Sequence, residues 1–373
     1  MKYRIGISGS YGGMNLGDEA ILAAMLEELR VSVDADVVVF SVDPKDTTAR
    51  HQVRAVSVPE MDRDAVLHEL GQLDLFVVGG GGLLFDGKAE QVLRDVKWAQ
   101  SLGVPVMIYA VSVGPLTSPE SKQLVVQTLD DVEVLTVRDH EAKKTLHDLG
   151  LSRDVTVTAD PALLLAPQPF TEEMLTSEGV SPGTRLVGFS VREPGPAAPD
   201  LDVDHYHAIL ANAADFMADR FDAQILFVPM EPGNQRDPQH AHAVISKMTH
   251  ARRAGVLKGD YSSAQILGLV GHMAFAVGMR LHFLIFAAMQ QVPFVPLPYA
   301  SKVSGLLADL EMPMPPLSEL NTGKLCAFID RSWDTRRTLA QHLRAHVPGL
   351  QARAKQTNTI LCDLLARLPV RPG

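Results

Sequence analysis

Short, almost uninterrupted apolar runs alternate with helical patterns along this chain, and this alternation is the strongest constraint on its fold. Val37–Phe40, Asp74–Val78 and Val104–Val113 are such runs in the first half. Before them, Asp18–Arg30 carries apolar residues at helical spacing on one face. Strands that are apolar on both faces are typical of a parallel sheet that helices cover on both sides. The first half therefore predicts one doubly wound α/β domain.

The second half of the chain repeats this alternation after a segment rich in proline and glycine, residues 166–183. We therefore predict domains at residues 1–168 and 169–345, followed by a helical tail at residues 346–373. Ligands of such sheets bind at the carboxyl ends of the strands, and we expect them in a cleft between the two domains. The expected strands are Leu186–Val191, Gln224–Val228, Ala274–Val277 and Pro293–Val295, and the expected helices are His205–Phe221, Ser262–Val270, Leu281–Gln290 and Ser301–Leu310.

Composition argues against several classes of function. The net charge is −10 and no long run of lysine and arginine occurs, so we expect no nucleic-acid partner. The cysteines lie outside any metal-ligand spacing, and the pairs His205/His207 and His240/His242 place their side chains on different helix faces, so we expect no metal. No run reaches the roughly 20 apolar residues of a membrane span. The polar start of the chain does not resemble a signal peptide, which favours a cytoplasmic protein.

Two glycine-rich segments follow strand patterns in the first half. Gly9–Glu19 lies between the first strand and the first helix, and Gly79–Asp86 follows Asp74–Val78. Glycines at these places allow a ligand to approach the backbone closely. The carboxylates of Asp18 and Glu19 would repel a phosphate and suit sugar hydroxyls, or the deprotonation of one. Two alternatives stay open: Asp18 only caps the helix, and the four glycines only make a tight turn.

Cationic side chains stand at strand ends in the second half. Arg280 and His282 lie where a strand meets an apolar helix and together form a candidate anion site, although a structural role is the alternative for the histidine. Arg192 ends another strand, and a local pair with Glu193 is an equal alternative. Lys302 follows the last strand, where it could also be an ordinary surface residue. Weaker candidates, in a segment that could be a solvated loop, are Glu231, Asp237 and His240.

Eight segments, in this order, carry a family resemblance: GSYGGMNLGDEAIL, VVGGGGLLFD, SVGPL, VRDHEA, ADPALLL, FSVRE, GMRLHFLIFAA and PYASKVSGLL. They resemble the polysaccharide pyruvyl transferase family, in particular the type that modifies the cell-wall polymers that anchor surface-layer proteins. The resemblance implies two Rossmann-like domains similar to the GT-B glycosyltransferases. It also implies phosphoenolpyruvate as co-substrate, no other cofactor, and a saccharide acceptor. That acceptor could be lipid-linked, so contact with the inner face of the membrane stays open.

The resemblance also implies how the substrates would be held. Phosphoenolpyruvate carries a carboxylate and a phosphate, so its site needs two cationic poles, and which cation serves which pole stays open. The donor-binding residues would be Arg280, Leu281, His282, Arg192 and Lys302. The acceptor-binding residues would be Gly13, Asn15, Asp18, Gly80 and Gly81.

Ketal formation requires an acid for the methylene carbon and a base for each hydroxyl. His282 is the candidate acid or phosphate-orienting group, and Asp18, with Asp86 behind it, is the candidate base. Two other functions stay open: a sugar-nucleotide glycosyltransferase of the same fold and a non-catalytic protein that binds sugars or nucleotides. A nicotinamide-dependent dehydrogenase is disfavoured, because the first strand–helix turn lacks the GxGxxG pattern.

Overall fold

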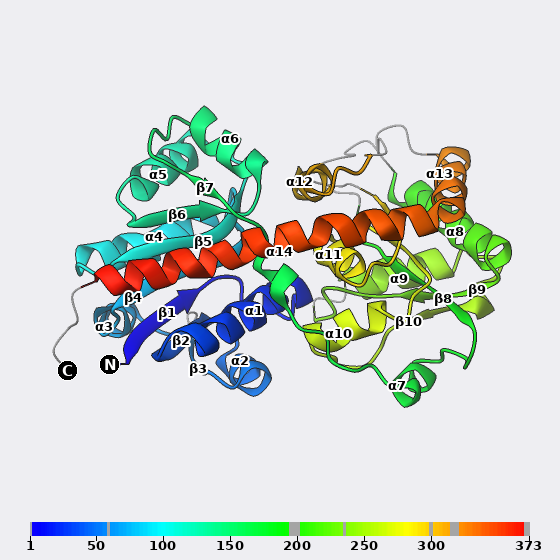
Figure 1. The fold of residues 1–373 in the computed structure, drawn as a ribbon, viewed down its shortest axis with the longest axis horizontal. Coiled ribbons are helices and arrows are strands. Elements are labelled where there is room, and N and C mark those ends of the chain that lie inside the picture. The colour runs from blue at the N-terminus through cyan, green and yellow to red at the C-terminus, as the bar shows by residue number, and fades with distance from the viewer. Residues whose placement is uncertain are drawn as a thin grey trace. The chain divides into compact units, whose positions relative to one another are not determined.

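The computed structural model describes residues 2–57, 60–193, 202–233, 236–297, 301–313 and 321–368 (Figure 1). The chain forms two compact units. The N-terminal unit consists of Met1–Gly13, Asp18–Leu165 and Leu350–Gly373, and the C-terminal unit of Met14–Gly17 and Ala166–Gly349. Each unit is thus assembled from segments that lie far apart in the sequence.

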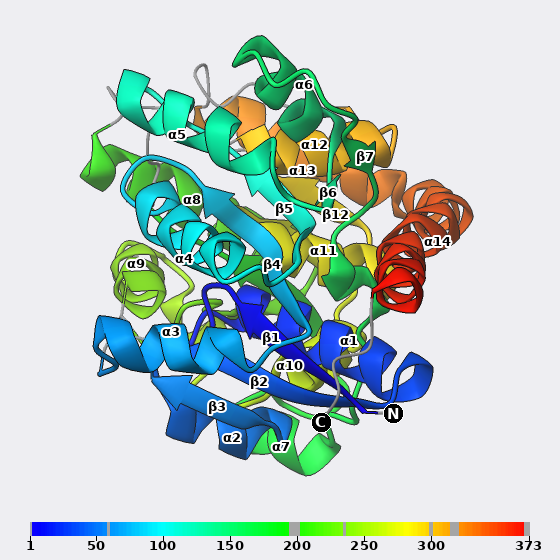
Figure 2. The same cartoon turned by 90° about the vertical axis from the view of Figure 1, so that its left-hand side faces the viewer.

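The N-terminal unit is built on a seven-stranded parallel sheet. Its strands are β1 (Tyr3–Ser8), β2 (Ala35–Ser41), β3 (Arg54–Ser57), β4 (Leu75–Leu84), β5 (Val106–Val113), β6 (Val134–Val137) and β7 (Thr156–Val157), in the order β3-β2-β1-β4-β5-β6-β7. Its helices are α1 (Leu16–Ser32), α2 (Pro44–His51), α3 (Arg63–Gly71), α4 (Ala89–Ser101), α5 (Pro119–Leu129) and α6 (His140–Asp148). Figure 2 shows α3 and α4 on one side of the sheet and α1 on the other.

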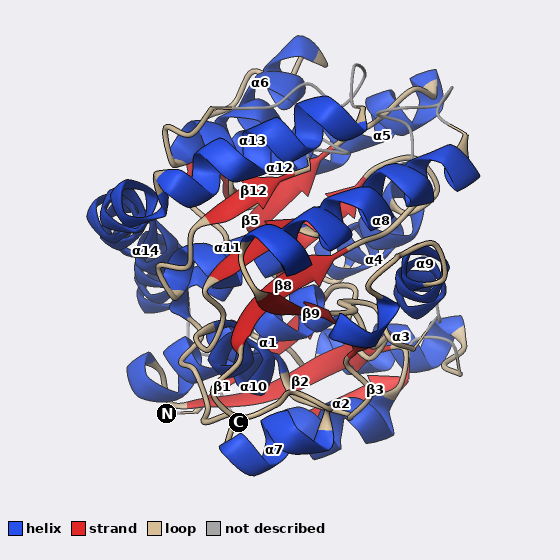
Figure 3. Ribbon diagram, turned by 90° about the vertical axis from the view of Figure 1, so that its right-hand side faces the viewer, coloured by secondary structure: helices blue, strands red, loops and turns tan. Residues whose placement is uncertain are grey.

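The C-terminal unit repeats this design with a five-stranded parallel sheet. Its strands are β8 (Arg185–Ser190), β9 (Ala223–Phe227), β10 (Ala254–Val256), β11 (Phe275–Gly278) and β12 (Phe294–Pro296), in the order β10-β9-β8-β11-β12. Its helices are α7 (Glu172–Ser177), α8 (Val203–Arg220), α9 (Arg236–Ile245), α10 (Ser263–Val270), α11 (Leu281–Met289), α12 (Ser301–Asp309) and α13 (Thr322–Asp334). Helix α8 packs against α9 and α13 (Figure 3).

The last helix, α14 (Arg336–Arg367), contributes to both units, because the division between them falls inside it. In its C-terminal part, Arg353 Nη2 donates to the carbonyl oxygen of Thr158 at 2.7 Å. The Tyr3 hydroxyl donates to the carbonyl oxygen of Leu365 at 3.2 Å. The end of the chain therefore completes the N-terminal unit.

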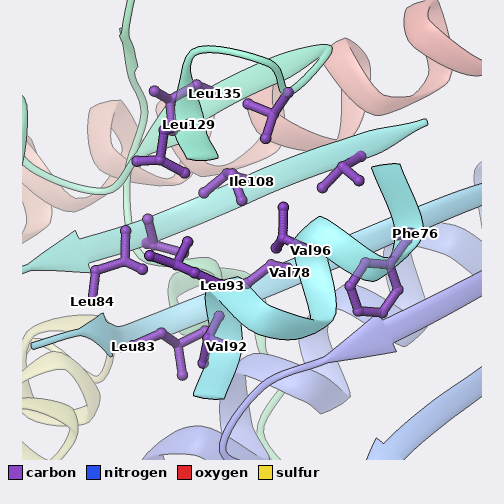
Figure 4. Packing of buried hydrophobic residues seen from close by; sticks show 14 of the residues in the cluster. Phe76, Val78, Leu83, Leu84, Val92, Leu93, Val96, Ile108, Leu129 and Leu135 are labelled. Carbon is purple, nitrogen blue, oxygen red and sulfur yellow. The ribbon is translucent and has the colours of Figure 1, made fainter. Parts of the chain in front are cut away.

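Large apolar side chains fill the space between β4, β5 and α4 (Figure 4). Phe76 and Ile108 come from the sheet, Leu93 and Val96 come from α4, and none of the four is accessible to solvent. Burial of a leucine or phenylalanine side chain stabilises the folded state by roughly 1.5–3 kcal/mol. This packing explains why the strand sequences are apolar without alternation.

Two elements differ from what the sequence predicts. Strand β4 runs through the four glycines to Leu84 instead of ending at Val78, because the glycine backbone continues to pair with β5. The segment after Pro229 leads into α9 and is not a solvated loop, since Asp237 is only 1% exposed there. In both cases pairing or packing with a distant segment decides the local structure.

Replacing Leu93 with alanine should lower the free energy of unfolding by about 2–5 kcal/mol, because it leaves a cavity in a closely packed core. Leu102, directly after the same helix, is 40% exposed. Its replacement with alanine should change the free energy of unfolding by less than about 0.5 kcal/mol. Urea unfolding followed by circular dichroism measures both variants, and equal effects would contradict the assigned core.

Candidate functional site

In both sheets most candidate residues lie at or just after the carboxyl ends of the strands between which the strand order reverses. In the N-terminal sheet these strands are β1 and β4, and in the C-terminal sheet they are β8 and β11. Connections leave such neighbouring strands toward opposite faces, which opens a crevice at their carboxyl ends. The topology thus places both glycine-rich segments at one such point and Arg192, Arg280 and His282 at the other.

A buried hydrogen bond joins the two glycine-rich segments of the N-terminal unit. The Tyr11 hydroxyl donates to the carbonyl oxygen of Gly79 at 2.7 Å. Burial, reinforced by the carboxylates of Asp18 and Glu19, raises the pKa of Tyr11 well above its ordinary value. The hydroxyl therefore keeps its proton and remains a donor to this carbonyl over the physiological pH range.

Glu19 holds the first glycine-rich loop in place and does not face a ligand. Its Oε1 accepts the backbone N–H of Gly12 at 2.8 Å, and its Oε2 lies 2.7 Å from Nε2 of His51. The residue is 3% exposed. The other carboxylate at the start of α1, that of Asp18, is partly exposed.

Asp18 lies against the second glycine-rich segment. A side-chain carbon added at Gly81 would come within 3.1 Å of Asp18 Oδ1, so the carboxylate rests beside this backbone. Asp18 is not the capping residue, because α1 begins before it, and the side chain of Asn15 accepts the N–H of Gly17 at 3.0 Å. Gly80 has a φ of +53°, and an added side-chain carbon there would lie 2.1 Å from Ile21.

The two remaining candidates of the N-terminal unit, Gly13 and Asp86, have different surroundings. Gly13 is exposed, and an added side-chain carbon would meet nothing within 4 Å. Asp86 Oδ2 accepts both the hydroxyl of Thr117, at 2.5 Å, and its backbone N–H, at 2.7 Å. The hydroxyl contact is the main cause that lowers the pKa of Asp86. A carboxylate with a lowered pKa is a weaker proton acceptor, so Asp86 is poorly suited to take a proton from a hydroxyl.

In the C-terminal unit, two carboxylates hold the guanidinium of Arg280. Its Nε donates to Asp237 Oδ2 at 2.9 Å, and its Nη2 donates to Asp237 Oδ1 and, at 2.5 Å, to Glu231 Oε2. Burial raises the pKa of Asp237, and the contact with Arg280 opposes this effect. Arg280 is 7% exposed. Its position is therefore fixed before any ligand arrives, and the two carboxylates balance its charge.

His282 lies in the first turn of α11 and packs against Gly17. A side-chain carbon added at Gly17 would lie 2.0 Å from His282 Nδ1, so only glycine fits beside this ring. Gly17 belongs to the C-terminal unit and directly precedes Asp18 in the chain. Leu281 is buried, which leaves its backbone as the part that can meet a ligand.

The other two residues expected to bind the donor, Arg192 and Lys302, follow different strands, β8 and β12. Arg192 Nη2 donates to Glu193 Oε1, as the local-pair alternative expects. Burial alone would raise the pKa of Glu193, but the contacts with Arg192 outweigh it and lower this pKa. Lys302 is partly buried in the first turn of α12, and the preceding Tyr299 and Ala300 lie outside the described residues.

Two further groups of side chains were not predicted as groups, although His240 alone was a weaker candidate. Arg138 follows β6, is 5% exposed and donates to Asp160 at 2.9 Å, while its Nη2 finds no hydrogen-bond partner among the described residues. Its position directly after a strand was the available signal. His207 of α8 and His240 of α9 lie within hydrogen-bond distance of each other. No local pattern could have revealed this pair, because it forms between two helices.

Two general properties of the described part of the chain bear on function. None of its helices has the length and hydrophobicity that a membrane span requires. Its histidine, cysteine, aspartate and glutamate side chains form no group of three or more that is placed to hold a metal ion.

Replacing Arg280 with methionine should lower the free energy of unfolding by about 3–5 kcal/mol, because it leaves buried carboxylates without their cation. Adding Asp237→Asn should recover part of this loss. The matched control is Arg220→Met, which removes an exposed arginine that also bridges two carboxylates, Asp330 and Asp334. That change should cost less than about 1 kcal/mol. Urea unfolding measures all three, and similar losses in both single variants would contradict a buried ion pair at Arg280.

Solved structures with the same fold are enzymes of sugar nucleotides and glycosyl transfer. The S. aureus MnaA–UDP structure has a TM-score of 0.67 at 12% identity, with 100% of both chains covered. The UDP-GlcNAc 2-epimerase from Neisseria meningitidis, bound to UDP-GlcNAc, has a TM-score of 0.64 at 10% identity, with 98% of this chain and 100% of that one covered. A glycosyltransferase from Rickettsia africae has a TM-score of 0.64 at 10% identity, with 99% and 100% covered. These likenesses confirm the predicted fold class, α/β with two Rossmann-like domains of the GT-B type.

Comparison with curated protein sequences gives no significant match. The sequence profile of the family described as polysaccharide pyruvyl transferase matches residues 15–301, which is well over half of the chain. This range contains both glycine-rich segments from Asn15 onward and the strand ends that carry Arg192, Arg280 and His282. The chain therefore belongs to the polysaccharide pyruvyl transferase family.

Proposed function

We propose that the protein transfers a pyruvyl group from phosphoenolpyruvate to a sugar of a cell-surface polysaccharide or of its lipid-linked precursor. The observation that carries this proposal is the group of Arg192, Arg280 and His282 at the carboxyl ends of β8 and β11, in a chain of this family. The carboxylates that contact Arg192 and Arg280 offset the charges of these two arginines, so an anion would be held by directed N–H donors and not by a net positive charge.

The reaction sets clear demands on these residues. One sugar hydroxyl adds its oxygen to C2 of the enol ether and loses its proton, while C3 of the donor gains one. Phosphate then leaves C2, and a second hydroxyl adds there and loses its proton, which closes the ketal. Phosphoenolpyruvate and a diol thus give a ketal and inorganic phosphate. An acid, a base and cations for the leaving phosphate suffice for this chemistry.

The geometry supports a role for each side chain. His282, at the start of α11, is the proposed acid for C3 and a contact for the phosphate. Asp18, which keeps a partly exposed carboxylate, is the proposed base for the acceptor hydroxyl. Arg192 and Lys302 supply cationic contacts to the donor. Because two carboxylates already hold Arg280, its contribution is a fixed set of N–H donors and not a net positive charge.

The proposed acceptor surface follows the glycine-rich segments. Gly80 and Gly81 are buried against Ile21 and Asp18, while the neighbouring Gly82 and the loop residue Gly13 are exposed. Asn15 fixes the start of α1 by capping it, which sets the direction of Asp18. A sugar ring can approach such a surface closely and donate its hydroxyl to the carboxylate.

A sugar-nucleotide glycosyltransferase is the second candidate, because solved structures of the same fold include a glycosyltransferase. Phosphate release from phosphoenolpyruvate, measured with a panel of nitrophenyl and lipid-linked glycosides, tests the first candidate. Release of UDP from UDP-sugars with the same acceptors tests the second. We expect phosphate release, and we expect it to persist with a chelator present. Turnover of UDP-sugars alone would overturn the proposal.

Two substitutions separate the roles of the two units. His282→Ala should lower kcat by about 10²–10⁴-fold, as for loss of a positioned acid. It should also weaken phosphoenolpyruvate binding, by about 1.5–3 kcal/mol. Asp18→Asn should lower kcat to a similar extent but leave donor affinity nearly intact, since a carboxylate offers an anion no attraction. Titration calorimetry gives the affinity and phosphate release gives kcat.

The matched controls are His272→Ala and Asp36→Asn, which change exposed residues outside the candidate site. Both should behave as the unsubstituted protein. A loss of donor affinity in Asp18→Asn as large as that in His282→Ala would show that the donor reaches the N-terminal loop, and the proposed division of roles would be wrong.

A further inference from the structure

Helices α8 and α9 bring two histidines together at the edge of the C-terminal site. Nε2 of His207 lies 2.8 Å from Nδ1 of His240, and the ring centroids are 5.1 Å apart. His207 is 8% exposed, so this contact is shielded from water. A hydrogen bond between two imidazoles holds one proton, so one nitrogen must donate and the other must accept.

The second nitrogen of His240 faces a carboxylate. Its Nε2 lies 4.0 Å from Glu193 Oε2, an oxygen that is inaccessible and makes no hydrogen bond within the described residues. The other oxygen of Glu193 accepts from Arg192. A continuous series of contacts thus runs from His207 through His240 and Glu193 to Arg192.

Electrostatics selects one arrangement of protons in this series. The carboxylate of Glu193 favours a proton on Nε2 of His240, so Nδ1 of His240 is the acceptor and Nε2 of His207 is the donor. Because the donor and the acceptor are then fixed, the ring of His240 has one orientation. This orientation places an N–H toward Glu193, and Glu193 in turn orients the guanidinium of Arg192.

We propose that His240, held by His207, is a positioning residue that fixes the Glu193–Arg192 pair at the end of β8, and thereby the donor contact of Arg192. The second half of this statement rests on the proposed function, in which Arg192 contacts phosphoenolpyruvate. His240 itself acts through Glu193 and needs no contact with the substrate.

The hydrogen bond between the two rings lasts only while the facing nitrogens share a single proton. One added proton can enter at Nδ1 of His207 and leave the bond between the rings intact. A second proton, on Nδ1 of His240, makes both facing nitrogens donors, so the bond breaks and the two cations repel each other. The positioning therefore operates at neutral pH and is lost at acidic pH.

The surrounding charges determine the pH at which this positioning begins to be lost. Burial is the main cause that lowers the pKa of both histidines. The charged groups that face the pair come from α8, from the first turn of α9 and the residues after it, from the end of β8 and from the start of α11. They are Asp204, Asp237, Lys247, Arg192, Glu193 and Arg280. For His240, Glu193 and Asp237 raise the pKa, while Arg192 and Arg280 lower it. The net result is a neutral pair at pH 7 that gains protons below the ordinary histidine pKa of about 6.5.

Two amide substitutions at position 240 separate the two contacts of the ring. His240→Gln extends its amide to the place of Nε2 and can still donate to Glu193. His240→Asn places its amide near Nδ1, so it reaches His207 but not Glu193. If the proposal holds, His240→Gln keeps the KM for phosphoenolpyruvate within about 2-fold at pH 7.5, while His240→Asn raises it about 10-fold, which corresponds to about 1.4 kcal/mol. In both variants kcat should change much less than KM.

The chain offers matched controls on the same two helices. His205 and His242 each lie two residues from a member of the pair and are exposed. His205→Gln and His242→Gln should leave KM and kcat unchanged. Equal KM values for His240→Gln and His240→Asn would overturn the positioning role.

A spectroscopic readout decides the proton arrangement without any activity. Nitrogen NMR of the imidazoles, assigned by the loss of signals in His207→Gln and His240→Gln, should show His240 with its proton on Nε2 at pH 7.5. A proton on Nδ1 of His240 would overturn the proposal. If the unsubstituted protein releases no phosphate from phosphoenolpyruvate, the proposed function fails, and this measurement still tests the histidine arrangement.

The linkage between protonation and folding gives a second check of the pair. Because both pKa values are lowered in the folded state, the unfolded chain takes up protons first as pH falls. The free energy of unfolding should therefore be at its full value above about pH 6.5 and decrease below it. In His207→Gln this decrease should be smaller, whereas His205→Gln should match the unsubstituted protein. Urea unfolding at pH 7.5 and 5.5 measures the difference, and an undiminished decrease in His207→Gln would contradict the buried pair.

Discussion

A parallel sheet that helices cover on both faces leaves only the ends of its strands open to a ligand. This constraint organises both units of the protein. In the N-terminal unit the ends of β1 and β4 carry the glycine-rich segments, and in the C-terminal unit the ends of β8 and β11 carry the arginines and the histidine. Apolar strands therefore determine where polar chemistry can occur, although they contribute none of it.

Each unit also contains a buried arginine that follows a strand and contacts two carboxylates. Arg138 contacts Asp160 and Asp139, and Arg280 contacts Asp237 and Glu231. Removal of such charges from water is costly, and the cost is tolerable only when partners surround them. The motif residues thus fall into two groups, those that are buried and hold the strand ends in shape and those that stay partly exposed, such as Asp18 and His282.

The sequence predicts the fold class and most strands, because apolar periodicity is a property of short segments. It also places the candidate residues at strand ends. It does not reveal which charged side chains form ion pairs, because these pairs depend on how the helices pack. Glu19 is one example, since it contacts His51. Asp237 is another: a solvated loop was an open alternative for its segment, and the residue is buried against Arg280. The pair of His207 and His240 joins two helices and has no local signature at all.

The use of α14 by both units has a consequence for biosynthesis. Arg353 and Leu365 complete the N-terminal unit through Thr158 and Tyr3, yet they emerge from the ribosome only after the C-terminal unit. The unit that is translated first therefore cannot finish folding until the whole C-terminal unit has been made. During that interval the apolar sheet of the nascent N-terminal unit lacks the cover that α14 supplies, and exposed apolar strands of this kind are prone to aggregate.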